Sequence, residues 1–506
     1  MIPVLTREAA YALDRDTIES GYLSENELMH NAGKSIAQFI IENVKDPFNQ
    51  KFNIIAGVGN NGGDAIIAHA YLLEYEANSS LFLINKTQFT DDLVKKYRIP
   101  EDKCNLLSEK KIFDTSEWYL DGIIGIGLNR KIEGKYATVL EQLSLCSNII
   151  SIDIPSGIIA NTGIDAGYAI QAQCTLTMGN PKLGHFFNTG KDYTGILEIL
   201  DIGFKLEAVS KENIQLIEID DIRDRLHAPM ENTHKYKQGK LLLICGSKGY
   251  AGAALLTAQG AIKSGTGIAK MIIPESLYAI IENNVPEVIT LPVPEFIPGS
   301  LSLENAERVT DELTWSDAMV FGSGLTMDMG ENQWKAKILK ETKIPLVLDA
   351  AGFLPLAEGN LSISELPDCC VLTPHYNEFA QIFKMDKESV TADPIKAVKN
   401  IISILEGRVL VLKGPTTIIV TSTGDILLND HGNSLLATAG TGDVLSGVIG
   451  ALLSNGYNSD DAAIIGTWLH GECAQQFSAF SSSKGLIASD LPYFLPAAWD
   501  SIQHVY

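Results

Sequence analysis

Short apolar runs that alternate with longer amphipathic runs are the feature of this sequence that most restricts its fold. Such alternation is typical of strands and helices that build a doubly wound parallel sheet. In the first half, strands are expected at 52–57, 118–124, 148–154 and 174–178, and a helix at 64–76. After about residue 225 the pattern begins again, with strands expected at 240–245, 268–273, 317–321, 345–348, 369–372 and 409–412, and helices at 251–264, 442–454 and 461–477. We therefore expect two α/β domains, with a linker near residues 206–220.

The composition excludes several classes of function. The chain has 506 residues and a formal net charge of −23, and such a field repels nucleic acids. No apolar run reaches the ~20 residues of a membrane span, and the N-terminus lacks the pattern of a signal peptide. The seven cysteines are scattered, without a C-x-x-C pair, and most are expected to be buried free thiols. A reducing cytoplasm fits this pattern best.

A glycine-rich segment joins the first expected strand to the helix after it, with the sequence Gly57-Val58-Gly59-Asn60-Asn61-Gly62-Gly63-Asp64. Glycines let the backbone approach a ligand closely, and a helix N-terminus offers unpaired N–H groups to a phosphate. The asparagines add carbonyl oxygens and amide donors. A glycine-rich turn by itself can be purely structural, but the contiguous Asn-Asn-Gly-Gly-Asp is much rarer and indicates a binding loop.

Two aspartates lie at the ends of further strands in this half. Asp121 falls within the strand at 118–124, and Asp153 precedes Ile154-Pro155-Ser156-Gly157. Ligands bind outside the carboxyl ends of strands in open α/β sheets, although either aspartate alone could simply cap a helix or turn. Asn61, Asp121 and Ser156 together offer only oxygen ligands, which suits a hard cation.

This half resembles NAD(P)H-hydrate epimerase, the N-terminal domain of the bifunctional NAD(P)H-hydrate repair enzymes, from about Leu5 to Phe204. The resemblance rests on residues 28–33, 60–64, 153–157 and 177–182. It implies a Rossmann-like three-layer αβα domain over residues 1–210, with a potassium ion on Asn61, Asp121 and Ser156. The residues that it implies for binding hydrated NADH or NADPH are Asn60, Asn61, Gly62, Gly63, Asp64, Gly125, Ile126, Gly127, Leu128, Asn129, Arg130, Lys131 and Asp153.

Epimerisation at C6 of the hydrated ring requires a bond at that carbon to break and form again. We expect Asp153 to handle a proton while the cation offsets phosphate charge or developing charge. Two positions depart from the family's pattern, because His30 stands where Glu is common and Ala65 where glycine is common. We expect Ala65 to narrow the approach to the loop.

The strongest signal in the second half is Gly440-Thr441-Gly442-Asp443, which enters an apolar helix. The amides of residues 439–442 can form an anion hole at the helix N-terminus, where they would stabilise charge on a transferring phosphoryl group. A carboxylate at Asp443 can then accept a hydroxyl proton, although Asp at a helix start is often only a cap. The lysine loop of P-loop enzymes is absent.

This Gly-x-Gly-Asp arrangement resembles the ribokinase-like superfamily. Further motifs at 246–254, 285–288, 321–325, 347–350, 371–375 and 412–417 resemble the ADP-dependent NAD(P)H-hydrate dehydratase, over about residues 221–500. The resemblance implies a ribokinase-like αβα domain over residues 221–506. It implies contacts with the hydrated cofactor from Ala253, Gly324, His375 and Asp443. It implies contacts with ADP or AMP from Lys413, Gly414, Pro415, Thr416, Thr417 and Gly442.

Some positions in this half are ambiguous or unusual. His375 alone could be an ordinary loop histidine, and Lys413 a solvated charge at a strand end, although near a nucleotide a lysine can pair with phosphate. Ser323, the pair Ala351-Gly352 and the pair Leu435-Leu436 depart from the family's pattern. These departures bear on the fit of the substrate rather than on the class of reaction.

The expected chemistry begins with Asp443, which deprotonates the C6 hydroxyl of the S hydrate so that the β-phosphoryl group of ADP transfers to it. Phosphate then leaves with loss of the neighbouring ring proton, which restores NADH or NADPH. Magnesium is expected because phosphoryl transfer between anions needs its charge neutralised. The small-molecule substrates are thus hydrated NADH or NADPH and ADP, and we expect a homo-oligomer.

Two alternatives remain open at this point. A ribokinase-like kinase for a vitamin precursor would use ATP and release a stable phosphorylated product. A non-catalytic nucleotide-binding or scaffold protein would bind without turnover. The sequence also leaves open the choice between NADH and NADPH hydrates, and no motif physically excludes the γ-phosphate of ATP.

Overall fold

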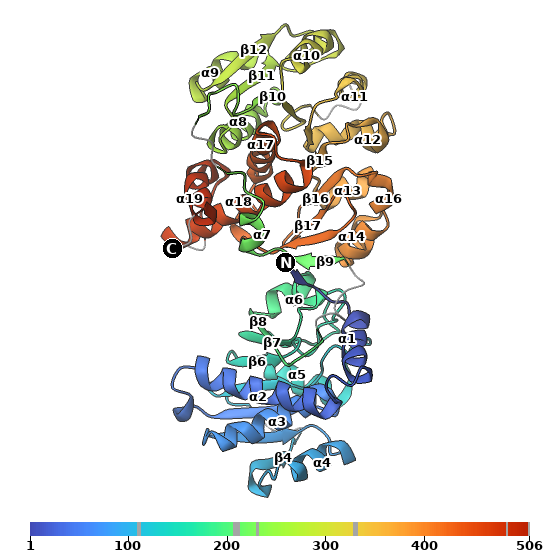
Figure 1. The fold of residues 1–506 in the computed structure, drawn as a ribbon, viewed down its shortest axis with the longest axis vertical. Coiled ribbons are helices and arrows are strands. Elements are labelled where there is room, and N and C mark those ends of the chain that lie inside the picture. Colours follow the sequence, from blue (N-terminus) through green and yellow to red (C-terminus); the bar gives the residue numbers. More distant parts are fainter. Residues whose placement is uncertain (109–112, 206–212, 229–231, 327–331, 482–483, 504–506) are drawn as a thin grey trace. The chain divides into compact units, whose positions relative to one another are not determined.

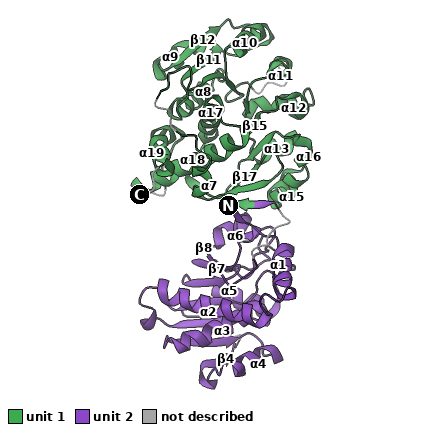
Figure 2. Cartoon of the chain, viewed as in Figure 1, with its two compact units in different colours: residues 1, 215–506 green, residues 2–214 purple. Residues whose placement is uncertain are grey.

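A computed structural model describes residues 1–108, 113–205, 213–228, 232–326, 332–481 and 484–503. It divides into two compact units, here called the N-unit (residues 2–214) and the C-unit (residues 215–506 with Met1), drawn in two colours in Figure 2. Of the linker expected at 206–220, residues 206–212 lie outside the described residues. The rest of it contains β9 (Ile214–Leu216) and the start of α7 (Ile219–Arg223).

The N-unit is built on a parallel sheet with the strand order β4-β3-β2-β5-β6-β7-β8 (Figure 1). These strands are β2 (Phe52–Ala56), β3 (Ser79–Leu83), β4 (Cys104–Leu106), β5 (Trp118–Gly122), β6 (Ile149–Ile152), β7 (Cys174–Met178) and β8 (Ile196–Leu200), and β1 (Ile2–Pro3) precedes them. The helices are α1 (Arg7–Glu19), α2 (Glu25–Asn43), α3 (Asn60–Glu74), α4 (Gln88–Lys96), α5 (Gly134–Leu143) and α6 (Asn188–Tyr193).

Helices cover both faces of this sheet. Successive residues of a strand point to opposite faces, so Ile54 packs in one core cluster with α2 and α3, whereas Ile55 packs in another with α5. Strands that are buried on both faces read as continuous apolar runs, and this is why they could be located from the sequence. The expected α/β class with three layers is confirmed for this unit.

Helix α3 begins at Asn60, earlier than the expected residue 64. Glycine is unfavourable in a helix, so the sequence suggested that Gly62 and Gly63 belong to the turn. The structure instead uses them for close packing, because a Cβ on Gly62 would lie 2.2 Å from the carbonyl oxygen of Gly57. The Asn-Asn-Gly-Gly-Asp motif therefore forms the first turns of the helix.

The C-unit sheet runs in the order β9-β18-β17-β16-β15-β14-β13-β10-β11-β12. Beyond β9 its strands are β10 (Lys240–Ile244), β11 (Ile268–Pro274), β12 (Val288–Val293), β13 (Ala318–Phe321), β14 (Leu346–Leu348), β15 (Cys370–Leu372), β16 (Val409–Leu412), β17 (Thr417–Val420) and β18 (Ile426–Asn429). Its helices after α7 are α8 (Ala251–Lys263), α9 (Tyr278–Asn284), α10 (Ala306–Leu313), α11 (Asn332–Glu341), α12 (Leu354–Glu358), α13 (Tyr376–Ile382), α14 (Lys387–Ala392), α15 (Pro394–Lys399), α16 (Ile402–Leu405), α17 (Thr441–Ser454), α18 (Ser459–Phe480) and α19 (Leu491–Gln503).

Part of this sheet departs from the parallel arrangement that the sequence predicts. β17 is antiparallel to β16, and β18 is antiparallel to β17. The segment between β17 and β18 is too short for the crossover that a parallel pair requires. Helices α8, α17, α18 and α19 share one core cluster on one face of the sheet, and Trp334 of α11 packs against Phe321 of β13.

Each sheet reverses its strand order at one point. In the N-unit the chain moves outward from β2 through β3 and β4, then returns to β5 on the other side of β2. In the C-unit the same reversal lies between β10 and β13. Crevices at such switch points, outside the carboxyl ends of the strands, are where open α/β sheets bind ligands.

Two further findings concern the surface and the thiols. None of the described helices is long and apolar enough to cross a membrane. All seven cysteines are free, and all but Cys104 and Cys369 are buried.

Candidate active sites

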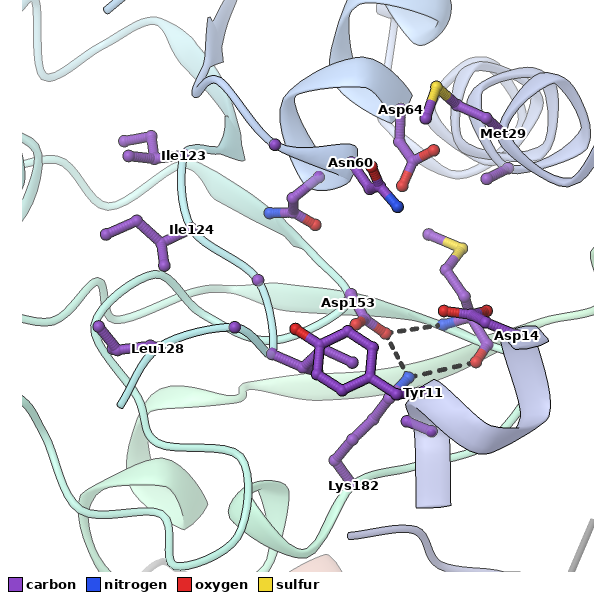
Figure 3. Close-up of a pocket in the computed structure, with 18 of the residues that line it drawn as sticks. Tyr11, Asp14, Met29, Asn60, Asp64, Ile123, Ile124, Leu128, Asp153 and Lys182 are labelled. Atoms are coloured by element: carbon purple, nitrogen blue, oxygen red, sulfur yellow. Dashed lines mark hydrogen bonds and ion pairs between the residues drawn. The ribbon is translucent and has the colours of Figure 1, made fainter. Parts of the chain in front are cut away.

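The N-unit has a cavity of about 1070 Å³ at its switch point, lined by the loops that follow β2 and β5 and by α1 and α2 (Figure 3). This volume is at the upper end of the range for small-molecule sites, as a dinucleotide requires. The cavity brings together these predicted residues: Asn60, Asn61, Asp64, Gly125, Ile126, Gly127, Leu128, Asn129, Arg130, Lys131 and Asp153. Gly62 and Gly63 are buried behind it, and Asp121 and Ser156 lie fully buried beside it.

Asp153 is held at the cavity wall by a network of donors. Its carboxylate accepts hydrogen bonds from the backbone N–H of Met178 (3.2 Å) and from the hydroxyl of Thr177 (3.2 Å). It also accepts one from the ammonium of Lys182 (Figure 3). The Lys182 ammonium also donates to the Thr177 hydroxyl (2.9 Å) and to the Met178 carbonyl (3.2 Å). All three protons of this lysine are therefore committed.

The backbone of Asp153 is strained, with a φ of +64°. Strain of this kind persists only where surrounding contacts hold the backbone in place, and it is common at functional sites. Here His185 contributes, because its Nδ1 accepts from the Lys182 N–H (3.1 Å) and its Nε2 lies 2.9 Å from the Asp153 carbonyl oxygen. Burial lowers the pKa of His185 to about 4, so the ring is neutral and Nε2 carries the donating proton.

Asp14 from α1 and Asp64 from α3 line the same cavity (Figure 3). Glu19, Glu25 and Glu133 line it as well. Burial and the charge of Asp153 raise the pKa of Asp14 to about 6, although Lys182 opposes this. Burial, Asp153 and Asp14 raise the pKa of Asp64 well above its ordinary value. The site therefore holds one carboxylate paired with a lysine and two carboxyl groups whose environment favours the protonated form.

Asp121 and Ser156 form a buried cluster beneath the loop that follows β5. The Asp121 carboxylate accepts from the Ser156 hydroxyl (2.5 Å), the Ser156 N–H (2.9 Å), the Ser151 hydroxyl (2.9 Å) and the Ile123 N–H (3.2 Å). Burial raises the pKa of Asp121, and these hydrogen bonds oppose the rise. Asn61 lies nearby, and its buried Nδ2 has no hydrogen-bond partner among the described residues.

The two unusual residues of this half lie away from the cavity. His30 bridges two tyrosines, with Nδ1 3.0 Å from the Tyr97 hydroxyl and Nε2 3.1 Å from the Tyr71 hydroxyl. The expectation that Ala65 narrows the approach to the loop is wrong. Ala65 is buried under the sheet, where a Cβ placed on Gly122 would lie 2.4 Å from the Ala65 methyl carbon.

In the C-unit, Asp349 is the centre of the polar network at the end of β14. Its carboxylate accepts from the Lys413 ammonium (2.9 Å) and from the hydroxyls of Thr373 (2.9 Å), Ser446 (2.9 Å) and Ser323 (3.4 Å). The side chain is only 3% exposed. Asp349 thus ties together the ends of β13, β14, β15 and β16 with helix α17.

Asp443 lies at the start of α17, next to this network. Burial and the charge of Asp349 raise its pKa to about 7, whereas Lys413 and a hydrogen bond from Ser323 oppose the rise. The helix begins after Gly440, whose φ is +93°. Among the described residues, the N–H groups of Ala439, Gly440 and Gly442 have no hydrogen-bond acceptor, whereas the N–H of Thr441 donates to the Thr438 carbonyl (3.4 Å). Three of the four amides expected to form the anion hole are therefore available to a ligand.

Lys413 and His375 lie side by side, because the strand ends that carry them form a parallel bridge. Burial disfavours the charge on Lys413, but Asp349 and Glu378 outweigh it and raise the pKa of this lysine. Its ammonium lies near the start of α17, 3.2 Å from where a Cβ on Gly442 would stand. His375 caps α13 by accepting from the Glu378 N–H at Nδ1 (3.1 Å), which leaves Nε2 for a ligand.

The remaining predicted residues of this half follow β10, β13 and β16. A Cβ on Gly324, whose φ is +68°, would lie 2.7 Å from the Cβ of Ala253, so these two positions adjoin each other at the switch point. In the loop after β16, Gly414 lies beneath the ring of Tyr376, and the Thr416 hydroxyl donates to Asp430 (2.5 Å). Pro415 and Thr417 belong to the same loop and the start of β17.

The sequence did not single out several residues that the structure adds to the two sites: Tyr11, Asp14, Lys182, Asp349, Tyr376 and Glu378. Lys182 and Asp349 each follow a buried strand, which was a usable signal. Asp14 carried none, because an aspartate on an amphipathic helix is usually a solvated residue.

Comparisons with known proteins match both halves. Residues 25–184 match the family described as YjeF-related protein N-terminus, and residues 241–495 match the family described as NAD(P)H-hydrate dehydratase. The bifunctional NAD(P)H-hydrate repair enzyme Nnr of Dictyoglomus turgidum is 31% identical, and the match covers 94% of this chain and 94% of that protein. The protein of the same name from Thermofilum pendens is also 31% identical, over 96% of this chain and 94% of its own length.

Solved structures agree for the second half. The ADP/ATP-dependent NAD(P)H-hydrate dehydratase from Bacillus subtilis, co-crystallised with ATP and Mg²⁺, is 28% identical with a TM-score of 0.50, over 57% of this chain and 99% of that chain. A ribokinase-like superfamily protein from Enterococcus faecalis, at 22% identity and a TM-score of 0.51, covers 58% of this chain and 99% of its own and shows the same fold. The chain therefore belongs to the family of bifunctional NAD(P)H-hydrate repair enzymes.

Proposed function

We propose that the N-unit cavity interconverts the R and S epimers of hydrated NADH and NADPH, and that the C-unit site dehydrates the S epimer at the expense of ADP. We assign the first activity to residues 1–210 and the second to residues 221–506. The observation that carries the proposal is Asp443, a carboxyl group with a raised pKa that lies at a helix start suited to bind phosphate. The same chain also has a cavity large enough for a dinucleotide. A bifunctional chain makes chemical sense because a stereospecific dehydratase clears only one epimer.

In the dehydratase step, Asp443 accepts the proton of the C6 hydroxyl, and the hydroxyl oxygen attacks the β-phosphoryl group of ADP. AMP leaves. The C6–O bond of the phosphorylated hydrate then breaks, phosphate departs, and loss of the neighbouring ring proton forms the double bond of NADH or NADPH. A pKa of about 7 suits a base at neutral pH, because the ionised form is well populated and still basic.

The nucleotide is proposed to bind along Lys413, Gly414, Pro415, Thr416, Thr417 and Gly442, and the hydrated cofactor to contact Ala253, Gly324 and His375. The closeness of the Lys413 ammonium to the start of α17 supports this, since an ammonium and free amides together stabilise phosphoryl oxygens. The Bacillus subtilis relative was crystallised with ATP and Mg²⁺, which supports magnesium as the ion that neutralises phosphate charge here. The preference for ADP over ATP remains part of the proposal.

In the epimerase step, Asp153 and Lys182 hold and return a proton at the reacting ring. Lys182 forms an ion pair with Asp153, and the strained backbone fixes the direction of its carboxylate. The loop from Gly125 to Lys131 brings Arg130 and Lys131 to the cavity, where they suit the phosphates of the cofactor.

A potassium ion is proposed at Asn61, Asp121 and Ser156, where it would offset phosphate charge. These residues fit a hard cation if the Asn61 amide turns, because its Nδ2 is buried without a partner and the turned amide presents an oxygen. Replacing potassium by a large organic cation should slow R-to-S exchange and leave dehydration of the S epimer unchanged. Equal exchange rates in both salts would remove the ion from the proposal.

We further propose that the chain works in the cytoplasm as a homo-oligomer. Its free cysteines suit a reducing compartment. Light scattering on the purified protein measures its mass in solution, and a monomer over the whole concentration range would contradict the assembly.

The function is tested by following nicotinamide absorbance and nucleotide products together. Purified protein with (S)-NADH hydrate, ADP and magnesium should form NADH, AMP and phosphate in equal amounts. A kinase for a vitamin precursor would instead form a stable phosphorylated product from ATP and no NADH. Binding of the hydrate without turnover would favour the non-catalytic alternative.

A further inference from the structure

Asp14 is a cavity-lining carboxyl group that the mechanism above does not use. It lies on α1 and faces the cavity across from Asp153 and Lys182 (Figure 3). Among the described residues it has no ion pair and no side-chain hydrogen bond. Lys182, the nearest cation named with it, already gives its protons to Asp153, Thr177 and the Met178 carbonyl.

The groups that face Asp14 from the neighbouring elements are mostly acidic. Asp153 after β6 and Glu25 of α2 act against its ionisation, and Lys182 after β7 favours it. Asp64 of α3 lines the same cavity, and Asp14 raises its pKa. On its own helix, Arg15 and Glu19 also line the cavity. Burial is the largest of these effects, and together they raise the pKa of Asp14 to about 6.

The position of Asp14 is fixed by the packing of α1. The Thr6 hydroxyl caps the helix by accepting from the Ala9 N–H (3.1 Å). Ala10, Leu13 and Thr17 are buried on one face of the helix, and the Thr17 hydroxyl donates to the Leu13 carbonyl (2.8 Å). Asp14 is thus presented from a rigid element, as an acid–base residue requires.

We propose that Asp14 is a second acid–base residue of the epimerase site, which acts directly on the hydroxyl group at C6 of the hydrated ring. This inference rests on the proposed epimerase function of the cavity. Protonated Asp14 gives its proton to the C6 hydroxyl, the C6–O bond breaks with its electron pair on oxygen, and water leaves. The lone pair of the ring nitrogen forms a C6–N double bond at the same time.

Water then adds to the opposite face of C6, the C6–N π electrons return to nitrogen, and the proton released by the water passes to the Asp14 carboxylate. The sum of these steps is inversion at C6 with no net gain or loss of atoms. No oxidant, reductant or further co-substrate is required.

The test compares Asp14→Asn with Asp16→Asn, a matched control on the exposed side of the same helix, in the full chain with potassium. R-to-S exchange is measured by chromatography over a range of pH, after subtraction of the spontaneous rate. We expect Asp14→Asn to lower kcat for exchange by about 10²-fold with little change in KM, because proton transfer and not binding is lost. The native rate should fall as pH rises through about 6, and this dependence should disappear in the variant.

Dehydration of the S epimer by the same preparation shows that the chain is folded, and thermal unfolding of the N-unit checks the stability of the variant. Native exchange by Asp14→Asn, or a rise in KM with an unchanged pH profile, would overturn the role of Asp14. If Asp153→Asn loses exchange while Asp14→Asn keeps it, the proposed epimerase site stands without Asp14. If the native protein itself accelerates no exchange, the proposed epimerase function fails as well.

Discussion

The N-unit and C-unit sites share an arrangement of charged groups but differ in what surrounds it. In each unit a lysine that follows one strand pairs with an aspartate that follows another, Lys182 with Asp153 and Lys413 with Asp349. In each, a further carboxyl group nearby has no such partner and its pKa is raised, to about 6 at Asp14 and about 7 at Asp443. The arrangement thus separates a carboxylate that is paired with a lysine from one whose pKa is raised toward neutrality.

The difference lies in what surrounds the titrating group. Asp443 stands at a helix start, where N–H groups are available to a phosphoryl group, so it is suited to act as a base beside such a group. Asp14 lies in a cavity among other acids, so it is suited to deliver a proton. Similar pKa values therefore serve opposite roles, because one site works when its carboxyl group is ionised and the other when it is protonated.

The largest effect is expected from Asp443→Asn. The amide cannot accept the hydroxyl proton, so dehydration of the S epimer should fall by about 10³-fold or more, while R-to-S exchange stays native. NADH formation from pure S hydrate measures the first, and chromatography of the epimers the second. Loss of both activities would mean that the two sites are not independent.

A smaller but still large effect is expected from Lys182→Met. The change removes the cation that holds Asp153 and leaves a carboxylate without its partner, so exchange should fall by about 10²-fold. The dehydratase activity of the same preparation is the internal control, together with the melting temperature. Native exchange in this variant would show that the ion pair serves only stability.

The pH dependences of the two activities should run in opposite directions. Dehydration should rise as pH increases through about 7, as Asp443 loses its proton, whereas exchange should fall as pH increases through about 6. Burial and then the charge of Asp349 raise the pKa of Asp443. Asp349→Asn should therefore shift the rise of the dehydration rate with pH to lower pH. If the dehydration rate of this variant rises over the same pH range as that of the native protein, a group other than Asp443 accounts for the pH dependence.

A moderate effect is expected from Gly324→Ala, which tests whether the C-unit site tolerates an added methyl group next to Ala253. The new methyl group would meet the Cβ of Ala253 at 2.7 Å in a backbone with a φ of +68°. We expect a loss of about 1–2 kcal/mol in unfolding free energy and a higher KM for the hydrate. Gly249→Ala is the control, since its φ is +90° but nothing lies within 4 Å. If Gly324→Ala and Gly249→Ala have equal effects, backbone strain alone explains the result and the contact with Ala253 does not contribute.

The smallest effect is expected from His30→Glu, which introduces the residue more common in the family. His30 bridges Tyr71 and Tyr97 outside the cavity, so exchange should not change measurably, although the melting temperature should fall slightly. A large change in exchange would place His30 in the reaction and would alter the comparison of the two sites.

The α/β class, both glycine-rich loops and many of the strands could be predicted from the sequence, because strands buried on both faces are continuous apolar runs. The order of the strands within each sheet was not predicted, and β3, β4, β8, β12, β17 and β18 were not expected. β7 and β16 have the expected bounds, and the other expected strands begin and end within two residues of theirs. The start of α3 was misjudged, because Gly62 and Gly63 are used for close packing, which a propensity argument does not detect.

The sites were only partly accessible from the sequence. Asp153 and Asp443 follow strands or open helices, so local patterns reveal them. Asp14 matters only because α1 packs over loops that lie far away in the sequence, and no local pattern encodes that contact. Similarly, Ser323 departs from the family's pattern, but its bond to Asp349 became visible only when β13 and β14 were seen side by side.

The central claim is that two separate acid–base sites in one chain act in sequence on the same damaged cofactor. The most direct test is complementation between Asp153→Asn and Asp443→Asn, with a mixture of R and S NADH hydrates, ADP, magnesium and potassium. The recovery of NADH absorbance is measured. We predict that Asp153→Asn converts the S fraction to NADH, with only spontaneous conversion of the R fraction, and that Asp443→Asn converts neither fraction. An equimolar mixture of the two variants should convert both fractions to NADH. Failure of the mixture, or native clearance of the R fraction by Asp153→Asn alone, would contradict the account.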